Sequence, residues 1–347
     1  QSLPGPRPTV RRPTGKSMEE LNQLSIALAT LMQEAYPQLL GFMTYISALG
    51  TEEFFLLTLP AVYWCVNKRL GRQIGYFFLA SALINNILKN LFRQPRPFWL
   101  APAIQRGKAE GFGLPSGHVQ NVTAVVLILA AYVRRGWFWL LGLFFIFLMG
   151  MSRLYLGVHS LQDIVVGFTI GLLLFLVFIV WQQLMYDRYS KQILGRRLLI
   201  MILVPTFLAA VYIGFFFLIG PANTDVAWAE YIPAAELNGY EDIVSSLAGL
   251  FGFGIGILLE SSRIRFMVEG PIWKRVIRYI LGMTVALGIW AGLRAVFPAE
   301  PLWLALPFRF LRYLLLLFWV TYFAPWVFVK LRLAKANPES EVRITFS

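Results

Sequence analysis

The chain has 347 residues, of which 58% are hydrophobic and only 14% are charged, and its net charge is +13. This composition excludes the two or three soluble domains that the length alone would suggest, and it indicates one all-α, polytopic membrane bundle. The basic residues stand in short runs between apolar segments, so we interpret them as signals of membrane topology and expect no nucleic-acid partner. The single cysteine, Cys65, excludes a disulfide or a thiolate metal site within the chain.

The N-terminal part is polar and irregular. Residues 1–17 are rich in Pro, Arg and Gly, which predicts a flexible tail, and they lack the pattern of a signal peptide. Residues 18–50 have a helical pattern that is interrupted at Gln33, Glu34 and Pro37. We interpret them as one or two amphipathic helices at the membrane interface, with a tenth membrane crossing as the alternative.

Hydropathy then predicts about nine membrane spans, some shorter than the roughly 20 residues that cross a bilayer upright. Their approximate limits are residues 52–66, 73–91, 117–133, 137–155, 160–186, 198–220, 243–259, 276–296 and 302–329. We expect a core at residues 51–190, additional C-terminal membrane helices at 191–333 and a cytoplasmic tail at 334–347.

Basic residues decide the orientation of these spans. Runs of Lys and Arg follow the first, third, fifth, seventh and ninth spans, which places all of these runs on one side, and that side should be cytoplasmic. The opposite side has fewer Lys and Arg, but it carries Arg93, Arg96 and Arg153 at the ends of spans. We interpret Arg93 as a general anchor at the membrane surface. The other two need a local explanation, which the motifs below provide.

The stretch from Ser152 to Asp163 contains one of only two histidines in the chain. Arg153, His159 and Asp163 lie within a strongly apolar region, where ionisable residues usually face a wet, functional cavity. If a helix begins near Ser160, His159 and Asp163 lie four residues apart on one face. A carboxylate bonded to one imidazole nitrogen leaves the other free to act as a nucleophile or a general base. The alternative is a structural ion pair between Asp163 and Arg153.

Two further clusters precede this stretch. Lys89 and Arg96 belong to a Lys-x6-Arg-Pro pattern, and the second histidine, His118, ends the run Pro-Ser-Gly-His. The ordered set of three motifs over about 75 residues resembles the type 2 phosphatidic acid phosphatase superfamily. This superfamily comprises metal-independent membrane lipid phosphatases and their soluble acid phosphatase and haloperoxidase relatives. The resemblance covers about residues 52–186.

The chemistry of phosphoryl transfer explains the residue types. Negative charge spreads over the equatorial oxygens of the transferred group, and fixed cations stabilise it. Arg96 and Arg153 can each offer a two-pronged donor, while Lys89 adds a point charge. Ser116 and Gly117 stand where a span begins, so their backbone N–H groups can bind an anion. The predicted phosphate-binding residues are thus Lys89, Arg96, Ser116, Gly117 and Arg153.

The resemblance also implies the catalytic roles. His159 would attack phosphorus and form a phosphohistidine, with Asp163 orienting its ring. His118 would protonate the leaving alcohol and then help to activate water. The resemblance implies no cofactor and no metal ion.

The branch of the superfamily is less defined. The nine spans and the site on the non-cytoplasmic side resemble the sphingosine-1-phosphate phosphatases and the glucose-6-phosphatases, and residues 152–163 are especially similar to the sphingoid branch. Gly117 departs from that branch, which usually has Thr there. We expect hydrolysis of a sphingoid or isoprenoid phosphate monoester in the lipid bilayer.

Alternatives are phosphatidic acid, a lipid diphosphate or glucose 6-phosphate as substrate, a lipid phosphotransferase, or a non-catalytic lipid-binding protein. The sequence leaves the oligomeric state open. The glycines of residues 252–256 superficially resemble a dinucleotide motif, but no strand precedes them, and close packing of membrane helices explains them better.

Overall fold

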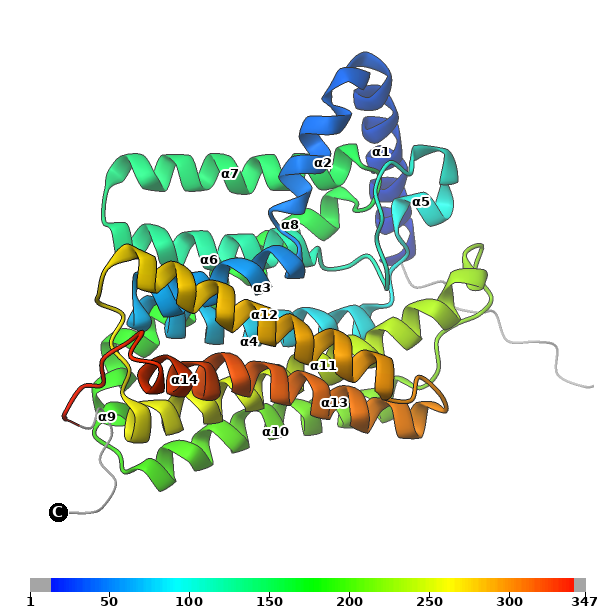
Figure 1. Cartoon of the computed structure of the whole chain (residues 1–347). Coiled ribbons are helices and arrows are strands. Elements are labelled where there is room, and N and C mark those ends of the chain that lie inside the picture. Colours follow the sequence, from blue (N-terminus) through cyan, green and yellow to red (C-terminus); the bar gives the residue numbers. More distant parts are fainter. Residues whose placement is uncertain (1–13, 340–347) are drawn as a thin grey trace, which may run out of the picture.

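The computed structural model describes residues 14–339. In that range the fold is built from helices and contains no strand, and its only β-type pairing is one isolated bridge between Phe266 and Ala336. The predicted all-α class is confirmed. Figure 1 shows most of the helices running side by side along one direction. Their bounds are α1 Thr14–Ala35, α2 Leu40–Ala48, α3 Glu52–Ala61, α4 Lys68–Phe92, α5 Pro97–Leu100, α6 Gly117–Val133, α7 Gly136–Tyr155, α8 Leu161–Val180, α9 Tyr186–Ser190, α10 Leu194–Ile219, α11 Ile232–Leu259, α12 Ile272–Val296, α13 Leu302–Phe318 and α14 Ala324–Lys330.

Six helical segments of the described range are long and apolar enough to cross a membrane: Gly136–Tyr155, Leu161–Ser190, Leu194–Ile219, Ala229–Ile264, Ile272–Val296 and Leu302–Lys330. They correspond to the last six predicted spans. The first three predicted spans fall on α3 with its π-helical continuation Val62–Val66, on the more polar α4, and on α6, which has 17 residues. These helices run alongside the other six (Figure 1), and the count of nine crossings stays a prediction.

Small residues let the helices of the core approach closely. An added Cβ at Gly167 of α8 would lie 2.6 Å from the carbonyl oxygen of Ser116, and one at Gly171 would lie 2.6 Å from that of Gln120. Since no side chain fits there, α8 packs directly on the first turns of α6. This contact brings the start of α6, with His118, beside the start of α8.

The same principle holds in the C-terminal half. A Cβ at Gly252 of α11 would collide with the backbone of Leu314 in α13, and one at Gly256 would collide with the side chain of Thr321. The prediction that the glycines of residues 252–256 serve helix packing is confirmed. The helices α11 and α13 thus form one tightly packed pair that lies beside α4.

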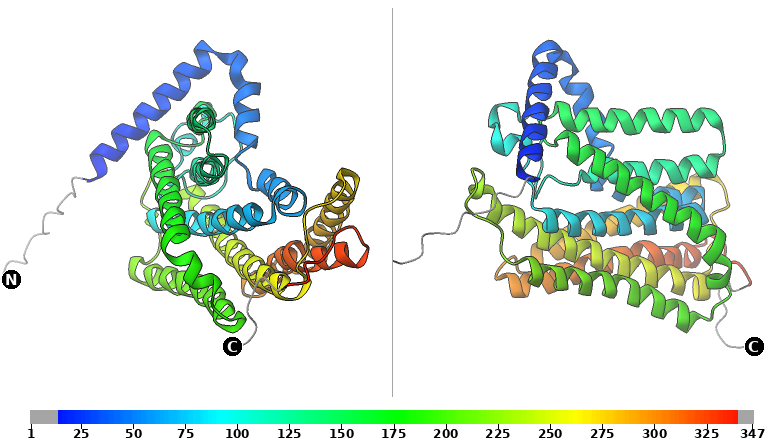
Figure 2. Two further views of the ribbon diagram at one scale, coloured as in Figure 1. Left: turned by 90° about the vertical axis from the view of Figure 1, so that its left-hand side faces the viewer. Right: turned by 180° about the vertical axis from the view of Figure 1, so that it is seen from behind.

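The N-terminal helices lie differently from the rest. Helices α1 and α2 form two arms of a V around one end of α6 and α7, as the end-on view in Figure 2 shows. Helix α1 contacts α7 and α8, and α2 contacts α7. Helix α1 begins at Thr14, within the stretch predicted as a tail, and residues 1–13 of that tail lie outside the described residues, as do residues 340–347 of the predicted C-terminal tail.

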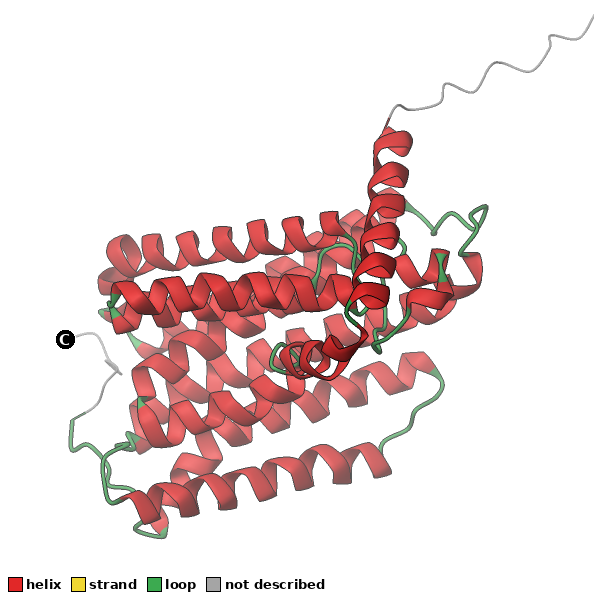
Figure 3. Ribbon diagram, turned by 90° about the horizontal axis from the view of Figure 1, so that it is seen from above, coloured by secondary structure: helices red, strands yellow, loops and turns green. Residues whose placement is uncertain are grey.

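Loops gather at the two ends of the bundle (Figure 3). The connections from α6 to α7, from α8 to α10 and from α11 to α12, which carry the predicted topology signals, lie at one end (Figure 1). The loop that holds α5 and the connection from α7 to α8 lie at the other end, next to α1 and α2. All the predicted site motifs therefore meet at the end that α1 and α2 surround.

Candidate active site

The connection between α7 and α8 positions His159. Gly157 turns the chain with a φ of +71°, and a Cβ there would collide with the carbonyl oxygen of Ile104, so only glycine fits. Ser160 then caps α8. Its hydroxyl accepts a hydrogen bond from the backbone N–H of Asp163, whose carboxylate accepts one from the N–H of Ser160. This reciprocal cap fixes the carboxylate of Asp163 one helical turn from His159.

Asp163 in turn orients the imidazole. Its Oδ2 lies 3.2 Å from Nδ1 of His159, and both side chains are buried. The other ring nitrogen, Nε2, lies 3.3 Å from Nη1 of Arg96. Because a guanidinium can only donate, Nε2 accepts this hydrogen bond and the ring proton lies on Nδ1, facing Asp163. The structure thus brings the two residues together as their spacing predicts, and among residues 14–339 Asp163 forms its ion pair with His159 and not with Arg153.

Arg96 is held by the loops that surround it. Its Nε donates to the carbonyl oxygen of Gly111 at 2.7 Å, Nη1 donates to that of Val158 at 3.0 Å, and Nη2 donates to that of Glu110. Only 2% of its surface is exposed. Burial lowers the pKa of Arg96 to about 10, so the side chain stays cationic at neutral pH. These bonds fix one positive charge directly beside Nε2 of His159.

The second arginine has donor capacity left over. Arg153 is 3% exposed, and its Nη1 donates to the hydroxyl of Ser47 in α2. Its Nε is buried without a hydrogen-bond partner, and so is the hydroxyl of Ser116 at the start of α6. Unpaired buried polar atoms are unfavourable and require an explanation. An oxyanion bound beside Arg153 would accept from its Nε.

Lys89 and His118 complete the set of predicted residues. Both are half-buried, and both lie within electrostatic range of Arg96 and Arg153. The backbone N–H of Ser116 donates to the carbonyl oxygen of Asp163 at 3.0 Å, so the prediction that this N–H binds an anion is wrong, and Ser116 offers its unpartnered hydroxyl instead. The eight residues predicted from the motifs therefore converge on one region from four helices and two loops.

Gly117 begins α6, next to His118. A Cβ at Gly117 would lie 2.9 Å from Oδ1 of Asn85, a separation that requires a shift of the amide. Asn85 itself donates to the carbonyl oxygen of Pro115 at 3.3 Å and to Oε1 of Gln120 at 2.9 Å. Asn85 thus holds the Pro-Ser-Gly-His turn through its bond to Pro115, and its side chain lies so close to residue 117 that glycine fits best there.

Electrostatics favours an unprotonated His159. Burial, and then the neighbouring charge of Arg96, lowers the pKa of His159 well below its ordinary value of 6.5. The imidazole is therefore neutral near pH 7. A neutral ring with its proton on Nδ1 presents a lone pair at Nε2, which is the requirement for nucleophilic attack.

Several residues that support the site were not predicted from the sequence. Ser47 is the partner of Arg153, although 106 positions separate the two residues. Gly50 lies against His118, since a Cβ there would be 3.0 Å from its Cδ2. Gln33, seen in the sequence only as an interruption of a helix, donates to the carbonyl oxygens of Ile104 and Tyr155 at 2.8 and 2.7 Å. No local pattern signals such long-range contacts.

Other polar residues lie outside the site. Arg93 donates to the carbonyl oxygen of Gly220 at 2.7 Å and lies 3.9 Å from the carboxylate of Glu236, so it anchors loops. Asn86 pairs with Ser246 of α11 at 3.0 Å, which is helix packing. Within the described part of the chain no three His, Cys, Asp or Glu side chains gather closely enough to hold a metal ion. Independence from metals and cofactors stays a prediction.

A cationic cluster with two histidines lies at one end of a bundle of apolar helices, and such a cluster has the charge that an oxyanion requires. Residues 71–187 match the sequence model of the PAP2 superfamily, and residues 244–336 match that of the PAP2 superfamily phosphatase, transmembrane extension. Phosphatidylglycerophosphatase B of Bacillus subtilis (strain 168) is 30% identical over 152 residues, which cover 40% of this chain and 73% of that protein. The chain belongs to the PAP2 superfamily, as its motifs predicted.

Two other similarities complete the comparison. Sphingosine-1-phosphate phosphatase 2 of Mus musculus is 31% identical over 145 residues, which cover 39% of this chain but only 40% of that protein. The crystal structure of a transmembrane PAP2-type phosphatidylglycerolphosphate phosphatase from Bacillus subtilis has 25% sequence identity and a TM-score of 0.43, and the match covers 49% of this chain and 88% of that one.

Proposed function

We propose that the protein is a membrane phosphatase that hydrolyses a lipid phosphate monoester through a phosphohistidine. The observation that supports this most is the orientation of His159, whose Nδ1 faces Asp163 while Nε2 faces Arg96. The relatives named above are phosphatases of sphingosine 1-phosphate and of phosphatidylglycerophosphate, which supports a lipid phosphate as substrate. A sphingoid or isoprenoid phosphate is the proposed class.

In the first step the phosphate oxygens replace Nε2 of His159 as acceptors for Arg96, and Arg153 and Lys89 neutralise further charge. The lone pair of Nε2 forms a bond to phosphorus, and the bond from phosphorus to the leaving oxygen breaks. Burial and the neighbouring cations lower the pKa of His118 in the empty site, so His118 takes up a proton when the phosphate anion binds and offsets these cations. It donates this proton to the leaving oxygen, and the alcohol leaves uncharged. Asp163 stabilises the positive charge that develops on the His159 ring.

The second step uses the same groups in reverse. His118, now without its proton, accepts one from a water molecule, and the resulting hydroxide attacks phosphorus. The bond between Nε2 and phosphorus breaks, which restores His159 and releases inorganic phosphate. An alcohol in place of water would give a phosphotransferase.

Phosphate release by the purified protein tests the proposal. The panel should contain sphingoid, isoprenoid and diacylglycerol phosphates, a lipid diphosphate and glucose 6-phosphate, each with and without an acceptor lipid. We expect the highest kcat/KM for a single-chain lipid monophosphate. Preference for glucose 6-phosphate, or transfer to the acceptor lipid in place of phosphate release, would replace the proposed activity by one of the alternatives.

We also propose that the site opens on the non-cytoplasmic side, because it lies at the end of the bundle opposite the basic connections. Gln105 is exposed in the loop near the site, and Arg135 is exposed at the other end. In a Cys65→Ala background, an impermeant thiol reagent should label Gln105→Cys and not Arg135→Cys in intact cells. The reverse labelling would refute this topology.

A further inference from the structure

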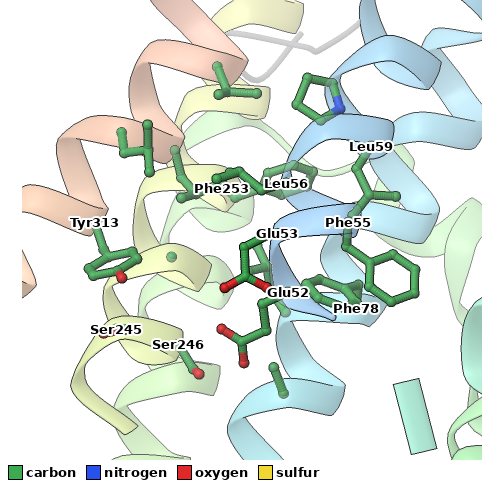
Figure 4. Close-up of a pocket in the computed structure, with 18 of the residues that line it drawn as sticks. Glu52, Glu53, Phe55, Leu56, Leu59, Phe78, Ser245, Ser246, Phe253 and Tyr313 are labelled. Atoms are coloured by element: carbon green, nitrogen blue, oxygen red, sulfur yellow. The ribbon is translucent and has the colours of Figure 1, made fainter. Parts of the chain in front are cut away.

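A groove with a cavity volume of about 180 Å³ lies between α3, α4, α11 and α13 (Figure 4). Most of its lining is apolar, with Phe55, Leu56, Phe78, Phe253 and Leu317 among the contributors. One wall comes from α11 and α13, which belong to the segment matched as the transmembrane extension. The phosphatase core and its extension therefore build this groove together.

The groove begins beside the candidate active site. Its polar end is marked by Glu52 and Glu53, at the first turn of α3 (Figure 4). Two residues before Glu52, Gly50 lies against His118, the proposed donor of the leaving-group proton. Glu52 is also within electrostatic range of Lys89. A lipid whose ester oxygen faces His118 therefore has the entrance of the groove next to its alcohol portion.

The two carboxylates at this entrance form no contact ion pair, although Lys89 and Arg309 lie within electrostatic range of Glu52. Among the ion pairs found in residues 14–339, none includes Glu52 or Glu53. The hydroxyl of Thr51 caps α3 by accepting from the N–H of Phe54, so the helix start is satisfied without them. Acidic residues also favour the positive end of a helix dipole, and this simpler explanation predicts no effect of Glu52 and Glu53 on substrate choice.

We propose that this groove holds the hydrocarbon chain of the lipid whose phosphate is cleaved, and that Glu52 and Glu53 favour a head group with an ammonium beside the phosphate. This inference rests on the proposed function. The apolar lining stabilises a chain because burial of methylene groups is favourable, on the order of fourfold in binding for each group. The carboxylates attract the ammonium and repel a second phosphate or a carboxylate on the head.

The chain part is tested with Leu317→Trp, which fills the groove, and Leu315→Trp, its neighbour on the exposed face of α13. The substrates are alkyl phosphates of increasing length, with nitrophenyl phosphate as the tail-free reference. For the longest chain, Leu317→Trp should lower kcat/KM relative to the reference by roughly tenfold or more, the loss of two or more buried methylenes. Leu315→Trp should leave the chain-length dependence as in the wild type. Equal behaviour of the two variants would overturn the assignment of the groove.

A second measurement needs no variant. A lipid phosphate with a diazirine near the end of its chain should label peptides of α11 and α13 in the wild-type protein. Labelling confined to α7 or α10 would place the chain elsewhere.

The head-group part is tested with the double variant Glu52→Gln, Glu53→Gln and with Glu230→Gln as a control. Each is assayed with a 2-amino alkyl phosphate and with the same chain without the amine. The ratio of the two kcat/KM values should fall roughly tenfold in the double variant, which corresponds to the weaker range of charged hydrogen bonds, and should not change in the control. An unchanged ratio would refute the head-group preference. Absence of phosphate release from every substrate by the wild type would refute the proposed function itself.

Discussion

Two regions of this molecule bury charged side chains, and they do so in opposite ways. In the cluster at the end of α11, the carboxylate of Glu260 accepts from Lys68 at 2.9 Å and from the N–H of Phe266 at 2.8 Å. There, too, Arg278 donates to four carbonyl oxygens, those of Trp64, Val268, Glu269 and Leu333. Both side chains are fully buried.

The site at the other end gathers Lys89, Arg96 and Arg153 within electrostatic range of each other. It leaves Nε of Arg153 and the hydroxyl of Ser116 without partners. Burial of charge is therefore no guide to function in this protein. The informative feature is the gathering of like charges, because it disfavours the fold unless an anion binds.

The largest effect should come from His159. His159→Ala removes the atom that would bond to phosphorus, so we expect loss of turnover and of any trapped phosphoenzyme. Glu260→Gln disturbs the other buried cluster, and it should lower thermal stability while the folded fraction keeps its kcat. Radiolabelled substrate and a thermal melt measure the two outcomes. Phosphoenzyme in His159→Ala would contradict the assigned nucleophile.

His118 should matter less. His118→Ala should slow turnover of a lipid phosphate by roughly 10²–10⁴, the usual contribution of a general acid. The loss should shrink for nitrophenyl phosphate, whose leaving group needs no proton. A phosphoenzyme that forms in His159→Ala but not in His118→Ala would show that the two histidines have exchanged roles.

Two arginines, Arg153 in the site and Arg278 in the other cluster, allow the two regions to be compared directly. Arg153→Lys should reduce kcat/KM by about 10 to 100-fold, because one charged hydrogen bond contributes about 1.5–3 kcal/mol and Lys cannot reproduce the fork. Arg278→Lys should instead lower the melting temperature, with kcat/KM of the folded protein close to wild type. Equal kinetic losses in both variants would erase the distinction between a site and a structural cluster.

The pH dependence should follow the shift at His159. Since burial and Arg96 lower the pKa of this imidazole below 6.5, the neutral nucleophile persists as the pH falls below that value. The acid limb of kcat/KM set by the enzyme should thus lie below pH 6.5. Below pH 6.5 the unfolded chain binds a proton at His159 that the folded chain does not bind, so the free energy of unfolding falls as the pH falls. Ionisation of the substrate phosphate also shapes the acid limb, so kcat/KM should be measured with two aryl phosphates whose phosphate pKa values differ. An acid limb above pH 6.5 that is the same for both substrates would contradict the assignment.

The smallest effect should be that of chelation. Lys89, Arg96 and Arg153 supply the positive charge that a metal ion provides in other phosphatases, so activity in EDTA should equal that in buffer. Activity that EDTA removes and magnesium restores would contradict this account of the cationic cluster.

The sequence predicted the all-α class, and it identified the residues that gather at the candidate site because each motif is local. A four-residue spacing places His159 and Asp163 on one turn whatever surrounds them. The membrane spans were harder to define, because α4 and α6 contain polar residues such as Asn85 and Gln120, which lower the mean hydropathy of these helices. In the structure the two side chains are hydrogen-bonded to each other. Ser47, Gly50 and the groove could not be predicted, because they depend on how distant helices pack.

The contacts of the N-terminal helices have a consequence for biosynthesis. Residues 18–50 emerge from the ribosome before their partners, which lie far along the chain. Ser47 bonds to a residue 106 positions later, Ser25 to one 136 positions later and Asn22 to one 140 positions later. Helices α1 and α2 therefore lack these contacts until the start of α8 has been translated. The full set of these contacts accordingly forms only after residue 162 has been translated, and a ribosome stalled before that point would carry a nascent chain without them.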